Sequence, residues 1–378
     1  MKPLFNFRVP SYDAHAINET IRSALASAGI TADKGGFAAG QNVVDVVART
    51  VEARTDSMPE PARRPRADEP KPPSGSFEAC LYAQPGRTCV YKLYVPARVL
   101  AAPPLLVMLH GCTQTADDFA AGTRMNRLAE EHGFLVVYPE QAASANPSKC
   151  WNWFKAQDQV RDAGEPALIA GIVREVAARH GVDSRRIFVA GLSAGAAMAV
   201  ILGQTYPELF AGVGAHSGLP YGSAHDIPSA LAAMKGGRSG IAGPKAMSNS
   251  ATTSRREGSR AAQAVPTIVF HGDRDHTVQL SNGIEIAQQA TNAHAAAATG
   301  AALRARTEKA APAGGRRYSR TVHVDAAGQT RVESWTVHGA GHAWAGGSKS
   351  GTYTDASGPD ASAEMLRFFL ALPRAGSA

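Results

Sequence analysis

Residues 186–195, Arg186-Ile-Phe-Val-Ala-Gly-Leu-Ser-Ala-Gly195, are the stretch that decides the fold. The apolar, β-branched run at 187–190 predicts a short buried strand, and the alanine-rich run at 196–203 predicts a helix. Between them stands the pattern Gly-x-Ser-x-Gly, whose small residues let strand and helix approach closely. The stretch therefore predicts a sharp turn with Ser193 at its apex, followed by a helix whose free N–H groups face developing negative charge.

Short apolar runs alternate with helical patterns along most of the remaining chain. Continuous apolar runs predict further strands near 105–109, 134–139, 265–272 and 332–337, and residues 212–218 predict the end of another. Apolar residues at helical spacing predict helices near 117–132, near 166–180 and in a closing segment that starts near Pro359. Strands that are apolar throughout are buried on both faces. The pattern therefore predicts an α/β fold with a mostly parallel sheet and helices on both faces.

The first 75 residues differ in composition from the rest of the chain. Residues 58–73 are rich in proline and charge, which is typical of a stiff, solvated linker. We expect 1–75 to be a poorly ordered N-terminal extension and linker, with docking to a partner or polymer granule as the alternative. The domain at 76–378 is expected to carry two mobile insertions, near 236–263 and 292–315, where small and polar residues show no periodicity.

Charge and composition exclude several classes of protein. The net charge is +7, but no basic helix is interleaved with aromatic residues, so we expect no nucleic-acid partner. No apolar run approaches the roughly 20 residues of a membrane-spanning helix. The N-terminus lacks the apolar core of a signal peptide, which favours a cytoplasmic location. Metal-ligand spacings and a Gly-x-Gly-x-x-Gly pattern are both missing, so we expect no metal and no cofactor.

An alternating pattern on both sides of Pro85-Gly86 predicts a β-hairpin near residues 79–96. A tight turn there places Tyr82 rather than Cys80 opposite Cys89. A Cys80–Cys89 disulfide would then need a bulge or a looser turn, and the sequence leaves this pairing open. None of the four cysteines lies in a Cys-x-x-Cys pair, which argues against a zinc site.

A serine hydroxyl becomes a good nucleophile only when a base accepts its proton and an acidic group orients that base. In doubly wound hydrolases, the three groups follow separate strands in the chain order serine, acid, histidine. Here Asp273-Arg-Asp275 follows the strand at 268–270, and a histidine-containing loop follows the strand at 335–337. Both the order and the placement agree with such a triad.

Two residues compete for each of the partner roles. We predict Asp275 as the acid, because Asp273 directly follows Gly272 and is placed to cap a turn. We predict His342 as the base, because flanking glycines let its loop bring the ring over the serine, whereas His338 at the strand end favours a structural hydrogen bond. Further alternatives are the histidines His216, His271 and His276 and the rival nucleophile Ser217.

An oxyanion hole needs two N–H donors that point at the same oxygen. We predict the backbone N–H groups of Ala194, next to the serine, and of Cys112, in the loop after the strand at 105–109. The Cys112 side chain is then free to form a disulfide with Cys150. Two unconnected thiols are the alternative interpretation.

Five motifs together give the chain a family resemblance. They are Leu109-His-Gly-Cys-Thr-Gln114, Cys150-Trp-Asn-Trp-Phe154, Gly191-Leu-Ser-Ala-Gly195, Phe270-His-Gly-Asp-Arg-Asp275 and Gly341-His-Ala-Trp344. In this order they resemble the esterase family of poly(3-hydroxybutyrate), or polyhydroxyalkanoate, depolymerases, whose relatives include feruloyl and acetylxylan esterases. The resemblance implies an α/β-hydrolase fold and ester hydrolysis through an acyl-enzyme on Ser193, Asp275 and His342. Because many family members are secreted, it also makes the extracellular region the alternative location.

The sequence therefore predicts a serine esterase that acts on short-chain hydroxyalkanoate polyesters or oligomers. The alternatives are a small-ester carboxylesterase, a feruloyl or acetylxylan esterase, a peptidase on the same fold, and a non-catalytic protein that binds polymer or granules. Contacts with substrate are expected from four side chains, with burial in the core as the alternative for the tryptophans: His110, Trp151, Trp153 and Trp344. A polymer granule surface is the partner that the alternative interpretation of the N-terminal extension implies.

Overall fold

The computed structural model describes residues 75–237, 264–298 and 302–373. Apart from Gly75, the N-terminal extension expected at 1–75 lies outside the described residues. So do residues 238–263 of the first expected insertion. The first described strand, β1, begins at Ser76.

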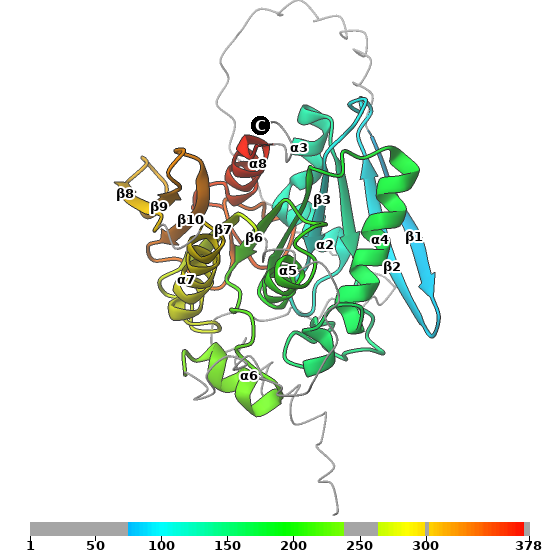
Figure 1. Cartoon of the computed structure of the whole chain (residues 1–378), viewed down its shortest axis with the longest axis horizontal. Helices are drawn as coiled ribbons and strands as arrows, with labels where there is room; N and C mark the ends of the chain where they lie inside the picture. Colours follow the sequence, from blue (N-terminus) through cyan, green and yellow to red (C-terminus); the bar gives the residue numbers. More distant parts are fainter. Residues whose placement is uncertain (1–74, 238–263, 299–301, 374–378) are drawn as a thin grey trace, which may run out of the picture. The chain divides into compact units, whose positions relative to one another are not determined.

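Within the described residues, ten strands form one sheet in the order β1-β2-β4-β3-β5-β6-β7-β10-β9-β8 (Figure 1). Their bounds are β1 Ser76–Gln84, β2 Arg87–Val95, β3 Leu105–Leu109, β4 Leu135–Pro139, β5 Ile187–Leu192, β6 Gly212–His216, β7 Thr267–Gly272, β8 Arg304–Ala310, β9 Tyr318–Val324 and β10 Thr330–Val337. The six central strands, from β4 to β10, pair in parallel. Antiparallel strands extend the sheet at both ends. Two short strands, β11 (Trp344–Ala345) and β12 (Thr354–Asp355), pair with each other.

Helices cover both faces of the sheet, as the sequence predicts. Helices α4 (Gly164–His180), α5 (Ala194–Thr205) and α7 (Leu280–Ala297) contribute to the core on one face. Helices α2 (Ala116–Thr123), α3 (Met125–His132) and α8 (Ala361–Ala371) contribute to the core on the other. A short helix, α6 (Ile227–Met234), follows β6, and a single 3₁₀ turn, η1, covers Ala156–Asp158. No helix in the described ranges has the length and apolar character needed to cross a membrane.

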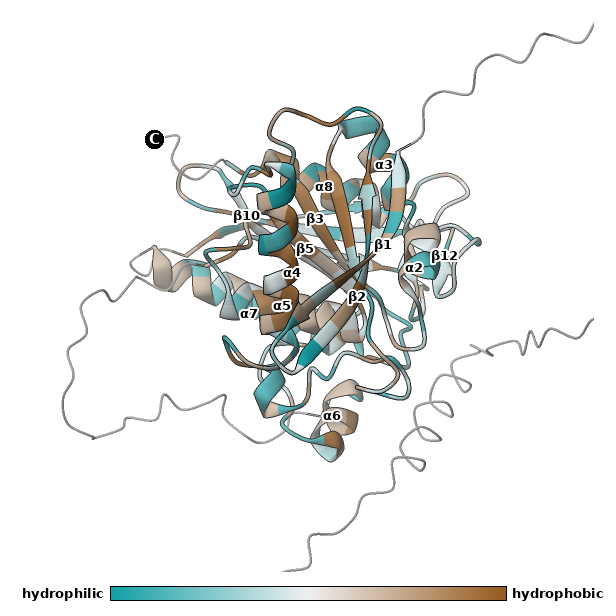
Figure 2. Cartoon of the chain, turned by 90° about the vertical axis from the view of Figure 1, so that its right-hand side faces the viewer, coloured by the Kyte–Doolittle hydropathy of each residue, from teal (hydrophilic) through white to brown (hydrophobic). Residues whose placement is uncertain are grey.

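The strand β3 shows why the central runs are apolar throughout. Leu105, Val107 and Leu109 pack with the α4, α5 and α7 face, and Leu106 and Met108 pack with the opposite face. Successive side chains of a strand point to opposite faces, so a strand between two helix layers needs apolar residues at every position. Figure 2 shows β3 in the hydrophobic colour along its length.

The prediction of a single helix at 117–132 is wrong, because the chain forms two helices that are separated by Arg124. Arg124 has a left-handed backbone (φ 55°) and caps the end of α2. Its guanidinium donates to the carbonyl of Gly346 at 2.6 Å and contacts the carboxylate of Asp360 at 3.3 Å. These contacts with distant residues fix the break, and Gly122 just before it is a weak helix former.

The prediction of a second mobile insertion at 292–315 is also wrong over most of that range. Residues 292–297 form the end of α7, and Arg304–Ala310 form β8. The strand β8 is exposed along nearly all of its length, so its charged sequence lacks the apolar alternation of a half-buried strand. It forms because it pairs with β9, which the local pattern does not reveal.

The hairpin at the start of the domain has the register expected of a tight Pro85-Gly86 turn. Tyr82 pairs with Cys89, and Cys80 pairs with Tyr91. Cys80 and Cys89 are therefore not opposite each other, and both thiols are free. Burial raises the pKa of the Cys89 thiol to about 12.

Candidate active site

Ser193 stands at the turn between β5 and α5 in a strained backbone conformation. Its φ is 57° and its ψ is −119°, which is uncommon for a residue other than glycine. The neighbouring glycines make this turn possible. A Cβ on Gly191 would lie 2.4 Å from the carbonyl carbon of Gly195, and one on Gly195 would lie 2.1 Å from the carbonyl oxygen of Leu109. Strand and helix approach too closely for any larger residue at either position.

Asp275 and His342 form a buried carboxylate–imidazole pair. Oδ2 of Asp275 lies 2.7 Å from Nδ1 of His342, and the two residues are 2% and 6% exposed. The other oxygen, Oδ1, accepts hydrogen bonds from the N–H groups of Thr277 and Val278. Burial alone would raise the pKa of Asp275, but the nearby charge and hydrogen bond of His342 hold it below its usual value.

His271 adds a second imidazole to this carboxylate. Its Nε2 lies 3.5 Å from Oδ2 of Asp275 and donates to the carbonyl of Val278 at 2.8 Å. Burial lowers the pKa of His271, which keeps the ring neutral. In the sequence His271 is one histidine among several, and only the loop that folds back from Asp275 to Val278 brings it to the carboxylate.

The competing acid and base residues pair with each other. Oδ2 of Asp273 lies 2.8 Å from Nδ1 of His338, and Oδ1 accepts from the N–H of Gly339 at 2.6 Å. Nε2 of His338 lies 2.9 Å from Oγ of Ser319. Asp273 and His338 thus make the structural hydrogen bonds that their positions in the sequence suggest.

The rival serine, Ser217, is fully buried. Its N–H donates to the carbonyl of Phe270, and its hydroxyl lies 3.1 Å from Nδ1 of His216. It does not line the pocket that contains Ser193.

The loops that carry Ser193, Asp275 and His342 all leave the same edge of the sheet. Strand β5 pairs with β6, β6 with β7, and β7 with β10, all in parallel, so the carboxyl ends of these strands meet at one edge. Ligand sites of open parallel sheets lie at this edge.

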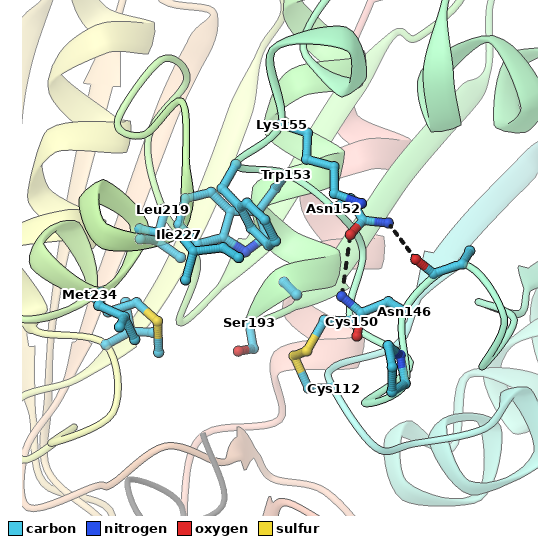
Figure 3. Close-up of a pocket in the computed structure, with 17 residues that line it drawn as sticks. Cys112, Asn146, Cys150, Asn152, Trp153, Lys155, Ser193, Leu219, Ile227 and Met234 are labelled. Carbon is cyan, nitrogen blue, oxygen red and sulfur yellow. Dashed lines mark hydrogen bonds between the residues drawn. A yellow bond between two sulfur atoms is a disulfide. The ribbon is translucent and has the colours of Figure 1, made fainter. Parts of the chain in front are cut away.

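Ser193 opens into a pocket of about 230 Å³ (Figure 3). It lies between the Cys112–Cys150 disulfide on one side and Met234 of α6 on the other. The lining is mainly apolar and comes from the loops after β3, β4, β6 and β7, from the turn between β5 and α5, and from α6: Cys112, Ala145, Asn146, Pro147, Cys150, Asn152, Trp153, Phe154, Lys155, Ser193, Ala194, Leu219, Ile227, Ala230, Leu231, Met234 and Val278.

A disulfide and a buried carboxylate hold the wall formed by residues 145–155. Cys112 and Cys150 are bonded with an S–S distance of 2.06 Å, which joins the loop after β3 to the loop after β4. Glu165 of α4 accepts from the backbone N–H of Asn152 at 2.7 Å and from the side-chain amides of Asn152 and Gln141. Burial raises the pKa of Glu165 to about 7, and the charge of Asp158 acts in the same direction.

The backbone N–H groups of Cys112 and Ala194 belong to residues that line the pocket beside Ser193. Ala194 is the first residue of α5, so its N–H has no partner within the helix. The N–H groups on either side of Cys112 are occupied, because Gly111 donates to Gln114 and Thr113 donates to Ser148. No backbone hydrogen bond found among the described residues uses the N–H of Cys112 or of Ala194.

Of the four side chains expected to contact substrate, Trp153 lines the pocket and the other three do not. His110 is buried, with its Nε2 accepting from the N–H of Gln141. Trp151 packs near the His110 ring in the core. Trp344 stacks on His216 and donates to Ser362. The direction of each ring depends on packing against distant residues, which the local sequence does not specify.

Comparisons with known proteins agree with this arrangement. A family model described as "Esterase PHB depolymerase" matches residues 89–312. Poly(3-hydroxyalkanoate) depolymerase C of Paucimonas lemoignei is 35% identical over 274 residues, covering 68% of this chain and 59% of the relative. Acetylxylan esterase A of Aspergillus oryzae is 32% identical over 203 residues, covering 52% and 64%. The chain thus spans less than two thirds of each of these relatives.

A solved structure, the acetyl xylan esterase from Aspergillus awamori, superposes with a TM-score of 0.58 at 23% identity. The match covers 79% of this chain and 100% of that chain. This likeness supports the fold alone, and the chain has the expected α/β-hydrolase fold.

Proposed function

The chain belongs to the PHB depolymerase esterase family, and on this premise we propose that it is a serine hydrolase of short-chain hydroxyalkanoate polyesters or oligomers. The observation that supports the proposal most is the strained Ser193 in the lining of an apolar pocket, with a buried Asp275–His342 pair at the same edge of the sheet. Strand ends that carry a serine, an acid and a histidine in this chain order are the framework of nucleophilic ester hydrolysis.

In the proposed mechanism, Nε2 of His342 accepts the proton of Ser193 while Oγ attacks the ester carbonyl. Asp275 bonds Nδ1 of His342, which fixes the proton on that nitrogen and stabilises the imidazolium that forms. The imidazolium then gives its proton to the departing alcohol, which leaves an acyl-enzyme on Ser193. Water, deprotonated by His342, releases the acid and regenerates the serine.

The N–H groups of Cys112 and Ala194 are the proposed donors to the tetrahedral oxyanion. Both belong to rigid parts of the molecule, since Ala194 begins α5 and Cys112 is held by the disulfide to Cys150. Donors that are fixed before the reaction need no reorganisation when the charge develops, and one such donor is worth roughly 10²–10³-fold in turnover.

The pocket supports a short, apolar acyl group as the substrate part next to Ser193. Its volume of about 230 Å³ suits a chain of a few carbons, and Leu219, Ile227, Leu231 and Met234 supply apolar surface. A polyester chain would continue from this unit across the surface. Small acyl esters, and the acetyl and feruloyl esters in the names of the relatives, are alternatives that the substrate panel below separates.

The test is a panel of esters assayed with the wild type, Ser193→Ala and Ser217→Ala. The panel contains p-nitrophenyl butyrate, an oligomer of 3-hydroxybutyrate, amorphous polymer, acetylated xylan and methyl ferulate. We expect the oligomer and the polymer to be cleaved best, and Ser193→Ala to lose on the order of 10⁶-fold in turnover. Ser217→Ala is the matched control and should keep most activity. A wild type inactive on every ester would instead favour a non-catalytic polymer-binding protein.

We also propose that the N-terminal 75 residues contact the polymer granule. The support is their composition, with Arg63, Arg64 and Arg66 in a proline-rich segment. Replacing these three arginines with glutamine should weaken sedimentation with polymer granules and leave hydrolysis of p-nitrophenyl butyrate unchanged. Unaltered sedimentation would remove this part of the proposal.

A further inference from the structure

Lys155 brings a positive charge to the wall of the pocket at Ser193. Among the described residues that line this pocket, it is the one with a charged side chain, and the rest of the lining is mainly apolar. Lys155 is half-buried. A cation beside apolar surface loses part of its hydration, and a counter-charge would offset that loss.

The described part of the chain supplies no such counter-charge. No ion pair or side-chain hydrogen bond of Lys155 occurs among residues 75–237, 264–298 and 302–373. Lys149, in the same loop, pairs with Glu140 at 2.9 Å, and Lys235 donates to the carbonyl of His276. The lysine that lines the pocket is therefore left available for an anion that enters with the substrate.

The backbone of Lys155 is held in place on both sides. Its N–H donates to the carbonyl of Asn152 at 2.9 Å, and its carbonyl accepts from the N–H of Asp158 at 2.9 Å. Asn152 is in turn bonded through its backbone and its side chain to the buried carboxylate of Glu165. The ammonium group is thus attached to a fixed point of the pocket wall, which favours specific binding.

The position of Lys155 assigns the two parts of an ester to two sides of the pocket. In the view of Figure 3, Ser193 lies between Met234 on the left and Lys155 on the right. The apolar residues of α6 suit the acyl chain of the substrate. The side of the pocket that carries Lys155 is then left for the departing alcohol.

In a chain of 3-hydroxyalkanoate units, this alcohol carries a carboxyl group. The last unit of such a chain departs as an alcohol with a free carboxylate. Four bonds, or about 5 Å at standard bond lengths, separate that carboxylate from the ester carbonyl. A carboxylate on the acyl part would instead lie against the apolar residues of α6, which offer it no counter-charge.

We propose that Lys155 binds the free carboxylate of the terminal hydroxy acid, so that the ester bond next to the carboxyl end is cleaved and one unit is released at a time. This proposal rests on the proposed function. The bond between the acyl carbon and the alcohol oxygen breaks, and the imidazolium of His342 gives its proton to that oxygen. The carboxylate stays ionised beside Lys155.

The first test measures binding without turnover. Two ligands are titrated into the full-length Ser193→Ala variant by calorimetry. One is the linear dimer of 3-hydroxybutyrate with its free carboxylate, and the other is the same dimer with that carboxylate converted to a primary amide of similar shape. We expect the acid to bind roughly three- to thirtyfold more tightly, the worth of one partly exposed hydrogen bond between charged groups.

Three further variants, each made on Ser193→Ala, assign this ratio of dissociation constants to Lys155. Lys155→Met removes the charge and should bring the ratio to about one, whereas Lys155→Arg keeps the charge and should keep most of the ratio. Lys349→Met is the control, because it removes the same charge at an exposed position that does not line the pocket. Each ratio compares two ligands on one protein, so a partial loss of folded protein affects both equally.

The products of the wild type test the position of cleavage. A linear tetramer of 3-hydroxybutyrate should give monomer and trimer as its first products, and Lys155→Met should lower the early share of monomer. Two dimers as the main first product would overturn cleavage at the carboxyl end.

Equal binding of the acid and the amide to Ser193→Ala, or a ratio that survives in Lys155→Met, would overturn the carboxylate site. In either case, hydrolysis of p-nitrophenyl butyrate by the wild type would still support the proposed esterase. A ratio that depends on Lys155, in a protein that hydrolyses no ester, would support the carboxylate site and refute the esterase. The two proposals therefore fail separately.

Discussion

Asp273 binds His338 through the same pair of atoms, Oδ2 and Nδ1, that join Asp275 to His342. The two pairs connect the same two loops, which follow the neighbouring strands β7 and β10. The inner pair is buried, whereas about a third of each outer side chain is exposed to solvent. Two backbone bonds, from Asp273 to Val337 and from Arg274 to Ala340, complete the connection. The outer pair therefore braces the loops that hold the inner one.

Asparagine at the two aspartate positions should separate chemistry from support. Asp275→Asn leaves His342 without its anionic partner and should lower kcat on the order of 10⁴-fold. Asp273→Asn keeps the shape of the outer pair and should lower kcat only about tenfold through looser positioning, with KM unchanged. Steady-state kinetics on p-nitrophenyl butyrate measures both. Equal losses in the two variants would contradict the assignment of Asp275 as the acid.

Removal of the disulfide should damage the pocket wall. The bridge between Cys112 and Cys150 spans 38 residues, and bridges of this kind contribute about 2–4 kcal/mol to the free energy of unfolding. The double variant Cys112→Ser, Cys150→Ser should unfold at lower urea concentration and have a lower kcat/KM. Cys80→Ser, at a free thiol in β1, is the control. A mild reductant should lower the activity of the wild type and of this control alike, without changing that of the double variant further.

Filling the apolar wall on α6 should shorten the preferred acyl chain. Leu231 of α6 lines the pocket, and Leu231→Trp removes volume needed by a butyryl group. We expect kcat/KM for p-nitrophenyl butyrate to fall at least about tenfold, with a smaller loss for the acetate. Leu370→Trp makes the same change at an exposed position of α8 and should alter neither value. A parallel loss on both esters would show that α6 does not bind the acyl chain.

Acid should destabilise the fold through His216. This residue is fully buried, and burial, together with the nearby His271 and His342, lowers its pKa from 6.5 to about 3. Nε2 of His216 accepts a hydrogen bond from the N–H of Ala345. Protonation of Nε2 would place two donors against each other and remove this hydrogen bond. Between pH values of about 3 and 6.5, His216 binds more protons in the unfolded chain than in the folded one. The free energy of unfolding therefore falls as the pH drops below about 6.5, by about 1.4 kcal/mol for each pKa unit traversed.

Urea unfolding at several pH values checks this expectation. His216→Gln retains an acceptor for Ala345 but does not titrate, so its free energy of unfolding should depend less on pH in this window. Some dependence should remain, because burial also lowers the pKa of His294 to about 4. Identical pH profiles for the variant and the wild type would rule out His216 as a source of acid sensitivity.

The sequence predicted the elements whose signals are local. The strands near Leu105–Leu109 and Ile187–Leu192 are continuous apolar runs, and the Ser193 turn has its own glycine pattern. The pairing of Asp275 with His342 followed from chain order, because the ends of neighbouring parallel strands meet, and from the positions of the two residues within their loops.

Features that depend on distant contacts could not be predicted in this way. The break at Arg124 is fixed by residues more than 200 positions away, and β8 forms through its pairing with β9. The α6 wall of the pocket and the inward packing of Trp344 likewise arise from the tertiary arrangement. The composition of each segment gives no sign of these partners.

Gly283 limits how helix α7 can vary. A methyl group at this position would press on Nδ1 of His271, and the opposite side of that ring holds the loop of Asp275. A single carbon added at Gly283 would thus push the His271 ring toward the carboxylate of Asp275, which bonds the proposed base His342. Side chains on the outer surface of α7 do not meet this ring, whereas at this one inward position even alanine would press on it.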